Sequence, residues 1–162
     1  MRPLLISDTN VIIDLEEGGV LELLFQLPHE FAVPDILYDE ELHEQHSHLI
    51  GLGLQTLELS SDSMGYAMGL MENYGGPSAN DCFALALAKQ EDCPLVTGDK
   101  RLRKAADQEQ VSKLGTIWLL EQLLEHNLVS IEEIDESVKK MKLAGSRLPW
   151  GLLAEKLDKY RI

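Results

Sequence analysis

Short apolar runs alternate with longer stretches of helical periodicity along most of this chain, and this alternation limits its fold most strongly. Apolar runs of this length, bounded by polar or turn residues, are typical of buried strands. No Asn-Gly pair joins two of them, so consecutive strands are expected to be parallel. The predicted strands are 4–6, 31–33, 54–59 and 94–97, with 116–118 as a fifth strand or its remnant. The pattern predicts an α/β protein, an α/β/α three-layer sandwich around a parallel sheet of about five strands.

The stretches between these runs are predicted to be helices. The first, 11–27, is split by Gly18 and Gly19, and the helix over 62–74 places Met64, Ala67, Met68 and Met71 on one side. Further helices are expected at 35–48, 78–89, 100–106 and 119–125. From Ser130 onward only helices are predicted, over 131–143 and 149–160. We therefore expect one unit at residues 1–127 and a helical C-terminal extension at residues 128–162.

The charge of the chain limits the class of partner. It has 28 acidic residues against 14 Lys plus Arg, a net charge of −14, whereas a nucleic-acid binder usually shows a basic footprint. Acids gathered in a metal site, or on faces away from the substrate, would still allow such a partner. Two cysteines, Cys82 and Cys93, form no disulfide framework. Without a signal peptide or a membrane-length apolar stretch, a cytoplasmic location is expected.

Four acidic residues occupy positions that chemistry could use. Asp8 and Asp99 each follow a predicted strand, which places both at the carboxyl edge of the sheet, where open α/β sheets bind ligands. Asp81 falls in the first turn of a buried helix, beside the positive end of the helix dipole. Each also has a plain structural interpretation, because Asp residues commonly cap helices and Ser78 with Asp81 forms a capping-box pattern.

The fourth acid, Glu41, is chosen from a helical wheel. At 100° per residue it falls in the inward stripe that Leu37, Tyr38 and Leu42 define, whereas Glu40 falls outside it. A carboxylate among inward apolar residues is costly unless it is paired or binds a metal. A partly exposed helix residue is the alternative interpretation, and Glu40 is the reserve candidate. Because four gathered carboxylates repel one another, we expect a divalent cation, Mg²⁺ or Mn²⁺, to be held by Asp8, Glu41, Asp81 and Asp99.

A basic run follows Asp99 directly and is the densest in the chain: Lys100, Arg101, Arg103 and Lys104. Beside a metal site it could hold the phosphate backbone of a nucleic acid, and a solvated helix face is the equal alternative. His43 and His46 are spaced to meet a metal, but a solvated helix face is the stronger interpretation for them.

These segments, taken together and in order, resemble the PIN-domain family of metal-dependent nucleases. The matching pieces are 6–14, 33–42, 78–81 and 95–102. The resemblance covers roughly residues 1–125, and the order and spacing of the pieces are more specific than any one of them. The helical tail lies outside it.

The resemblance implies a fold, a site and an activity. It implies a five-stranded parallel sheet between helices, and a metal site of Asp8, Glu41, Asp81 and Asp99, with the family's Glu standing just before a Leu as Glu41 does. Asn10 would orient the first acid and Thr97 would support the fourth. The implied reaction is metal-assisted hydrolysis of single-stranded RNA. The implied biology is a VapC-type toxin or an RNA-processing nuclease, with RNA, a small antitoxin protein and a second copy of the chain as the partners to test.

Three other functions compete with a nuclease. A haloacid-dehalogenase-type phosphatase also begins with an Asp after a strand, but its proton-donating second Asp would stand at Asn10, which cannot donate that proton. A response-regulator receiver needs a phosphoacceptor Asp after the third strand, which Asp62 fits poorly. The third is a non-catalytic interaction module with the same fold, and the presence of all four acids argues against it.

Overall fold

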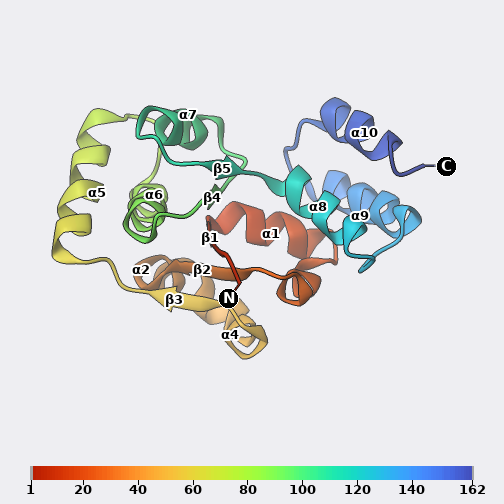
Figure 1. The fold of residues 1–162 in the computed structure, drawn as a ribbon, viewed down its shortest axis with the longest axis horizontal. Coiled ribbons are helices and arrows are strands. Elements are labelled where there is room, and N and C mark those ends of the chain that lie inside the picture. The colour runs from red at the N-terminus through yellow and green to blue at the C-terminus, as the bar shows by residue number, and fades with distance from the viewer. Residues whose placement is uncertain (1, 162) are drawn as a thin grey trace.

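A computed structural model describes residues 2–161 of the chain. Its first half alternates strands with helices, and β3 is followed by two helices before β4 (Figure 1). The elements in order are β1 (Leu4–Ser7), α1 (Thr9–Glu17), the 3₁₀ helix η1 (Leu21–Gln26), β2 (Glu30–Pro34), α2 (Asp35–Leu37), the π-helix η2 (Tyr38–Leu42), α3 (His43–His46), α4 (His48–Leu52), β3 (Gln55–Leu57), α5 (Ser61–Asn73), α6 (Ala79–Glu91), β4 (Leu95–Val96), α7 (Lys100–Gln108), β5 (Lys113–Leu114), α8 (Thr116–Glu125), α9 (Ile131–Ala144) and α10 (Trp150–Asp158).

The five strands form one parallel sheet in the order β3-β2-β1-β4-β5. Leu5 pairs with Phe31 on one side of β1, and Ile6 pairs with Leu95 on the other. The chain adds strands on one side of β1 first and then crosses to the other side, so the topological switch point lies between β1 and β4. Ligands of open α/β sheets bind outside the carboxyl ends of the strands at such a point.

Helices cover both faces of the sheet, which confirms the predicted three-layer sandwich. Figure 1 shows α5, α6 and α7 on one side of the strands and α1, α8, α9 and α10 on the other. Helix α6 contacts β1, β2 and β4, while α5 packs on its outer side. Every side chain from Cys82 to Ala88 is buried, as expected for a helix enclosed by the sheet and another helix. Across residues 2–161, no helix combines the length and the apolar character that a membrane crossing requires.

The predicted position of the fifth strand was wrong. Residues 116–118 form no strand, because β5 ends at Leu114 and Thr116 already begins α8. The last ladder bond is donated by Thr97 N to Leu114 O at 2.9 Å. Thr116 and Ile117 resemble strand residues only by their β-branched side chains. In α5, Met68 is 52% exposed, and the buried residues are Ala67 and Leu70.

The helix predicted over 35–48 is interrupted, and this interruption moves Glu41. Leu37, Tyr38 and Leu42 are buried as predicted, but Glu41 is exposed. The backbone N–H of His43 bonds to Tyr38 O, five residues back, so the helix is wider here than the wheel assumed. Glu41 is therefore turned out of the apolar stripe, and its proposed role rests on other contacts.

The C-terminal helices share the core of the preceding residues. Helix α9 packs against α1, and its buried residues Ile134 and Met141 belong to the same apolar cluster as the sheet residues. Gly18 makes this close approach feasible, because a Cβ there would collide with Ser137 Oγ and lie 3.1 Å from Met141 Cγ.

We predict that Met141→Ala destabilises the whole protein by about 2–4 kcal/mol, because it leaves a cavity between α1 and α9. Leu143→Ala, on the same helix but at a side chain that is 89% exposed, is the matched control and should change stability by less than about 0.5 kcal/mol. Urea denaturation followed by circular dichroism measures both. A second transition belonging to the C-terminal helices alone would contradict this expectation.

Candidate active site

Asp8 ends the central strand and is buried, with 1% of its surface exposed. Its Oδ1 accepts a hydrogen bond from Val11 N at 2.9 Å, so it is also the N-cap of α1. Its Oδ2 accepts a hydrogen bond from the Thr97 hydroxyl. The capping interpretation of Asp8 is thus correct, and the same carboxylate is tied across the switch point to the end of β4.

Thr97 connects two of the four acids. Its fully buried hydroxyl donates to Asp8 and accepts from the backbone N–H of Asp99 at 3.1 Å. The predicted support of Asp99 by Thr97 is therefore a contact with the Asp99 backbone, and the side-chain contact is with Asp8. The carboxylate of Asp8 receives its two bonds from Val11 and Thr97, while Asn10 is exposed.

Asp81 and Asp99 each begin a helix. Asp99 Oδ1 accepts from Arg101 N at 2.8 Å and from Leu102 N at 3.0 Å, which caps α7. Asp81 forms the predicted capping box, in which its Oδ2 accepts from Ser78 N at 3.0 Å. Among residues 2–161, the second oxygen of each carboxylate accepts no hydrogen bond, so each has an oxygen left for a ligand.

Glu41, in η2, reaches the same edge of the sheet. Its Oε2 accepts from the Thr9 hydroxyl, and its Oε1 accepts from Asn80 Nδ2 at 2.7 Å. Asn80 also donates to Glu40 Oε2 at 3.1 Å, but the Thr9 hydroxyl donates to Glu41 and not to Glu40. Thr9 and Asn80 were missed as positioning residues, although each stands directly beside a predicted acid in the sequence.

The four carboxylates act on one another electrostatically. Burial raises the pKa of Asp8 from its ordinary value of 3.8 to about 6, hydrogen bonds from Thr97 and Val11 oppose the rise, and the charges of Asp81 and Asp99 add to it. Burial also raises the pKa of Asp81, to which the charges of Asp99 and Glu41 contribute. The acids predicted from four separate segments therefore lie within one electrostatic neighbourhood.

The donor set suits a hard divalent cation. It consists of carboxylate oxygens, which Mg²⁺ and Mn²⁺ prefer, and a cation would offset the burial and the mutual repulsion that raise the pKa values of Asp8 and Asp81. Over residues 2–161, however, no three His, Cys, Asp or Glu side chains stand close enough to share one ion. The residues fit such an ion by their chemistry, and the carboxylates are neighbours that do not form a closed cage.

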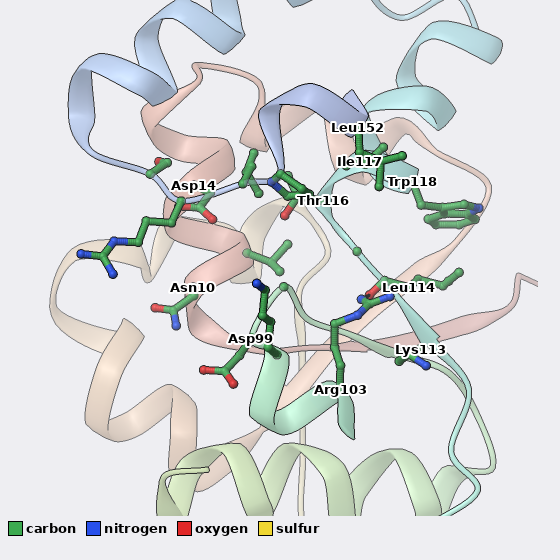
Figure 2. Close-up of a pocket in the computed structure, with 18 of the residues that line it drawn as sticks. Asn10, Asp14, Asp99, Arg103, Lys113, Leu114, Thr116, Ile117, Trp118 and Leu152 are labelled. Atoms are coloured by element: carbon green, nitrogen blue, oxygen red, sulfur yellow. Dashed lines mark hydrogen bonds between the residues drawn. The ribbon is translucent and has the colours of Figure 1, made fainter. Parts of the chain in front are cut away.

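A groove of about 1140 Å³ runs beside this edge, between α1, α7, the start of α8 and the segment that joins α9 to α10. In Figure 2, Asn10 and Asp14 lie on one side, Asp99 and Arg103 below, and Thr116 to Trp118 on the other side. Six of the 14 Lys and Arg residues of the chain line it, but only three of its 28 acids. The basic residues are Lys100, Arg101, Arg103, Lys113, Arg147 and Lys156.

The predicted basic run divides into different roles. Lys100 and Arg101 line the groove next to Asp99, whereas Lys104 is exposed on α7 outside it. Arg103 is half-buried and donates through Nη1 to Thr97 O at 2.6 Å and to Leu114 O at 3.0 Å. It thus joins α7 to the ends of β4 and β5. Arg147 and Lys156, which come from the C-terminal helical region, were not predicted to take part.

The sequence matches the PIN-domain family over residues 4–161, which is nearly the whole chain. The chain belongs to the PIN-domain family. Among curated proteins, no sequence matches it. A similar solved structure is that of VapBC2 from Rickettsia felis bound to a DNA fragment from their promoter, with 15% identity, a TM-score of 0.48, and coverage of 69% of this chain and 98% of that one.

In this PIN domain, Asp8 should make the metal-free protein less stable as pH rises. Its folded pKa of about 6 exceeds its ordinary 3.8, so the stability it contributes at low pH is lost as pH rises through that window. A shift of this size corresponds to about 3 kcal/mol. Asp8→Asn removes the charge but also loses one hydrogen bond, which contributes about 1 kcal/mol.

We therefore predict that Asp8→Asn is more stable than the wild type by about 2 kcal/mol near pH 7.5, and no more stable than it near pH 4. Urea denaturation in EDTA across this range measures the difference. An Asp8→Asn protein that is less stable than the wild type at every pH would leave capping as the whole role of Asp8.

Proposed function

We propose that this PIN domain is a divalent-metal-dependent ribonuclease that hydrolyses RNA phosphodiesters. The observation that carries the proposal is the set of four carboxylates from four segments, electrostatically coupled at the switch point of the sheet. The adjoining groove supports RNA as the substrate, because cations are concentrated in it although the chain is strongly acidic. Family membership supports the same activity.

In this proposal Asp8, Glu41, Asp81 and Asp99 hold Mg²⁺ or Mn²⁺. Such an ion, when bound, activates a water and stabilises the charge that develops on the phosphate and on the leaving oxygen. The other residues position these acids: Thr97 holds Asp8, while Thr9 and Asn80 hold Glu41. Lys100 and Arg101 lie where they can neutralise the phosphates of a strand that enters the groove beside Asp99.

The C-terminal extension takes part in this proposal. We keep residues 1–127 as the nuclease unit and residues 128–162 as the extension, which contributes Arg147 and Lys156 to the groove. We further propose single-stranded RNA as the substrate, and the role of toxin with a small antitoxin partner, on the basis of family membership. Co-expression with the product of a neighbouring reading frame, followed by size-exclusion chromatography, tests both the antitoxin and a homodimer.

We predict that the purified protein cleaves RNA when Mg²⁺ or Mn²⁺ is present and loses this activity in EDTA. Gel electrophoresis of a labelled RNA oligonucleotide measures it, with Asp8→Asn as the inactive control. Cleavage that survives chelation would refute the metal-dependent mechanism. Release of phosphate from a small phosphoester, without cleavage of RNA, would favour a phosphatase.

Glu41→Gln should lower the cleavage rate by about a hundredfold or more, because a metal-binding charge is lost. Glu40→Gln is the matched control: Glu40 is also exposed and also accepts a hydrogen bond from Asn80, but only Glu41 accepts one from Thr9. The rate of Glu40→Gln should stay within about twofold of the wild type. Initial cleavage rates at saturating Mn²⁺ measure both variants. Equal losses of rate would contradict the choice of Glu41 over Glu40.

A further inference from the structure

Helix α8 begins in the wall of the groove without a side-chain cap. Its N-cap is Gly115, which has no side chain to accept from the first turn. A larger residue is disfavoured there, because a Cβ on Gly115 would lie 3.2 Å from Arg103 Nη1. The first N–H groups of a helix have no partner within it and carry a partial positive charge. The groove therefore has an uncapped helix N-terminus in its wall.

Thr116, the first residue of α8, is a second and independent sign of a ligand. It lines the groove and lies between Asn10 and Ile117 in Figure 2. The residue is 2% exposed, and its Oγ1 has no hydrogen-bond partner among residues 2–161. A buried hydroxyl without a partner costs free energy, and a ligand at the start of α8 would remove that cost.

Arg103 places a positive charge next to the same turn. Its Nη1 donates to two backbone carbonyls, Thr97 O and Leu114 O, and both acceptors are neutral. In the described part of the chain, Arg103 forms no ion pair with a carboxylate. A half-buried guanidinium, an uncapped helix N-terminus and an unpartnered hydroxyl together make a site for an anion.

We propose that this site binds a phosphate of the RNA strand other than the one that is cleaved. The inference rests on the proposed ribonuclease function, because it takes RNA as the occupant of the groove. A strand is favoured over a free ion because the groove continues from this turn to Asp99, and to Lys100 and Arg147. Among residues 2–161, neither Lys100 nor Arg147 is in an ion pair. The α8 phosphate site sets how far along the groove the strand is held from the acids.

Thr116→Val tests the site, because it keeps the shape of the side chain and removes only the hydroxyl. Binding of a fluorescein-labelled single-stranded RNA is measured by anisotropy in EDTA, where the metal-dependent cleavage is stopped. We expect affinity to fall about tenfold, as for a lost hydrogen bond to a charged group, with an unchanged melting temperature of the free protein. Inorganic phosphate should compete with RNA for the wild type, and less well for Thr116→Val.

The matched control is Ser137→Ala. Ser137 is also 2% exposed and its hydroxyl is also unpartnered, but it lies beneath α1 and away from the groove. This variant should bind RNA as the wild type does. Equal affinity of Thr116→Val and wild type, an equal loss in Ser137→Ala, or no RNA binding by the wild type would each overturn the proposal. Phosphate that stabilises the protein without displacing RNA would overturn it too, because the site would then hold only a small ion.

Cleavage assays with Mn²⁺ separate this inference from the proposed function. If the wild type binds RNA through Thr116 but never cleaves it, the phosphate site stands and the ribonuclease proposal fails. If the wild type cleaves RNA and Thr116→Val binds and cleaves it equally well, the ribonuclease proposal stands and the phosphate site fails. In the expected result, Thr116→Val raises KM and leaves kcat nearly unchanged, since the phosphate bound there is not the one that is cleaved.

Discussion

The buried carboxylate of Asp8 is the constraint on which the site depends. A charge that is removed from water at the end of the central strand is costly unless hydrogen bonds or a counter-charge compensate for it. Two bonds do so in part: Val11 N fixes the start of α1, and the Thr97 hydroxyl fixes the end of β4. Because Thr97 also receives the N–H of Asp99, the position of the first acid determines the position of the last. The remaining strain is seen in the raised pKa of Asp8.

Helix capping and the proposed metal-binding role do not exclude one another in this protein. Asp8, Asp81 and Asp99 are all caps or capping-box residues, as the plain structural interpretation held. In a parallel sheet, however, a helix that directly follows a strand, as α1 and α7 do, begins at the carboxyl edge. The residue that caps it is therefore placed where ligands bind. At Asp81 and Asp99 the cap uses one oxygen of the carboxylate and leaves the other, so one Asp can serve both the fold and the proposed chemistry.

The parts of the structure that were predicted from the sequence depend on local rules. The first four strands, the buried α6 and the capping box at Ser78 follow from apolar runs and cap residues, which act over a few positions. The position of Glu41 did not follow, because the π-helix around it breaks the periodicity that a helical wheel assumes. The fifth strand was misplaced because Lys113–Leu114 is too short to show a pattern.

The groove could not be predicted, since its walls come from segments far apart in the chain. Arg147 follows a helix break in the sequence, and nothing local relates it to Lys100 or Thr116, yet all three line one space. The same fact explains how a chain of net charge −14 can offer a surface to an anion. With six cations and three acids in the groove, the excess negative charge lies entirely on the rest of the molecule. In the proposed function, this acidic exterior would repel RNA outside the groove, so the charge distribution that disfavours general nucleic-acid binding would favour a strand in the groove beside Asp99.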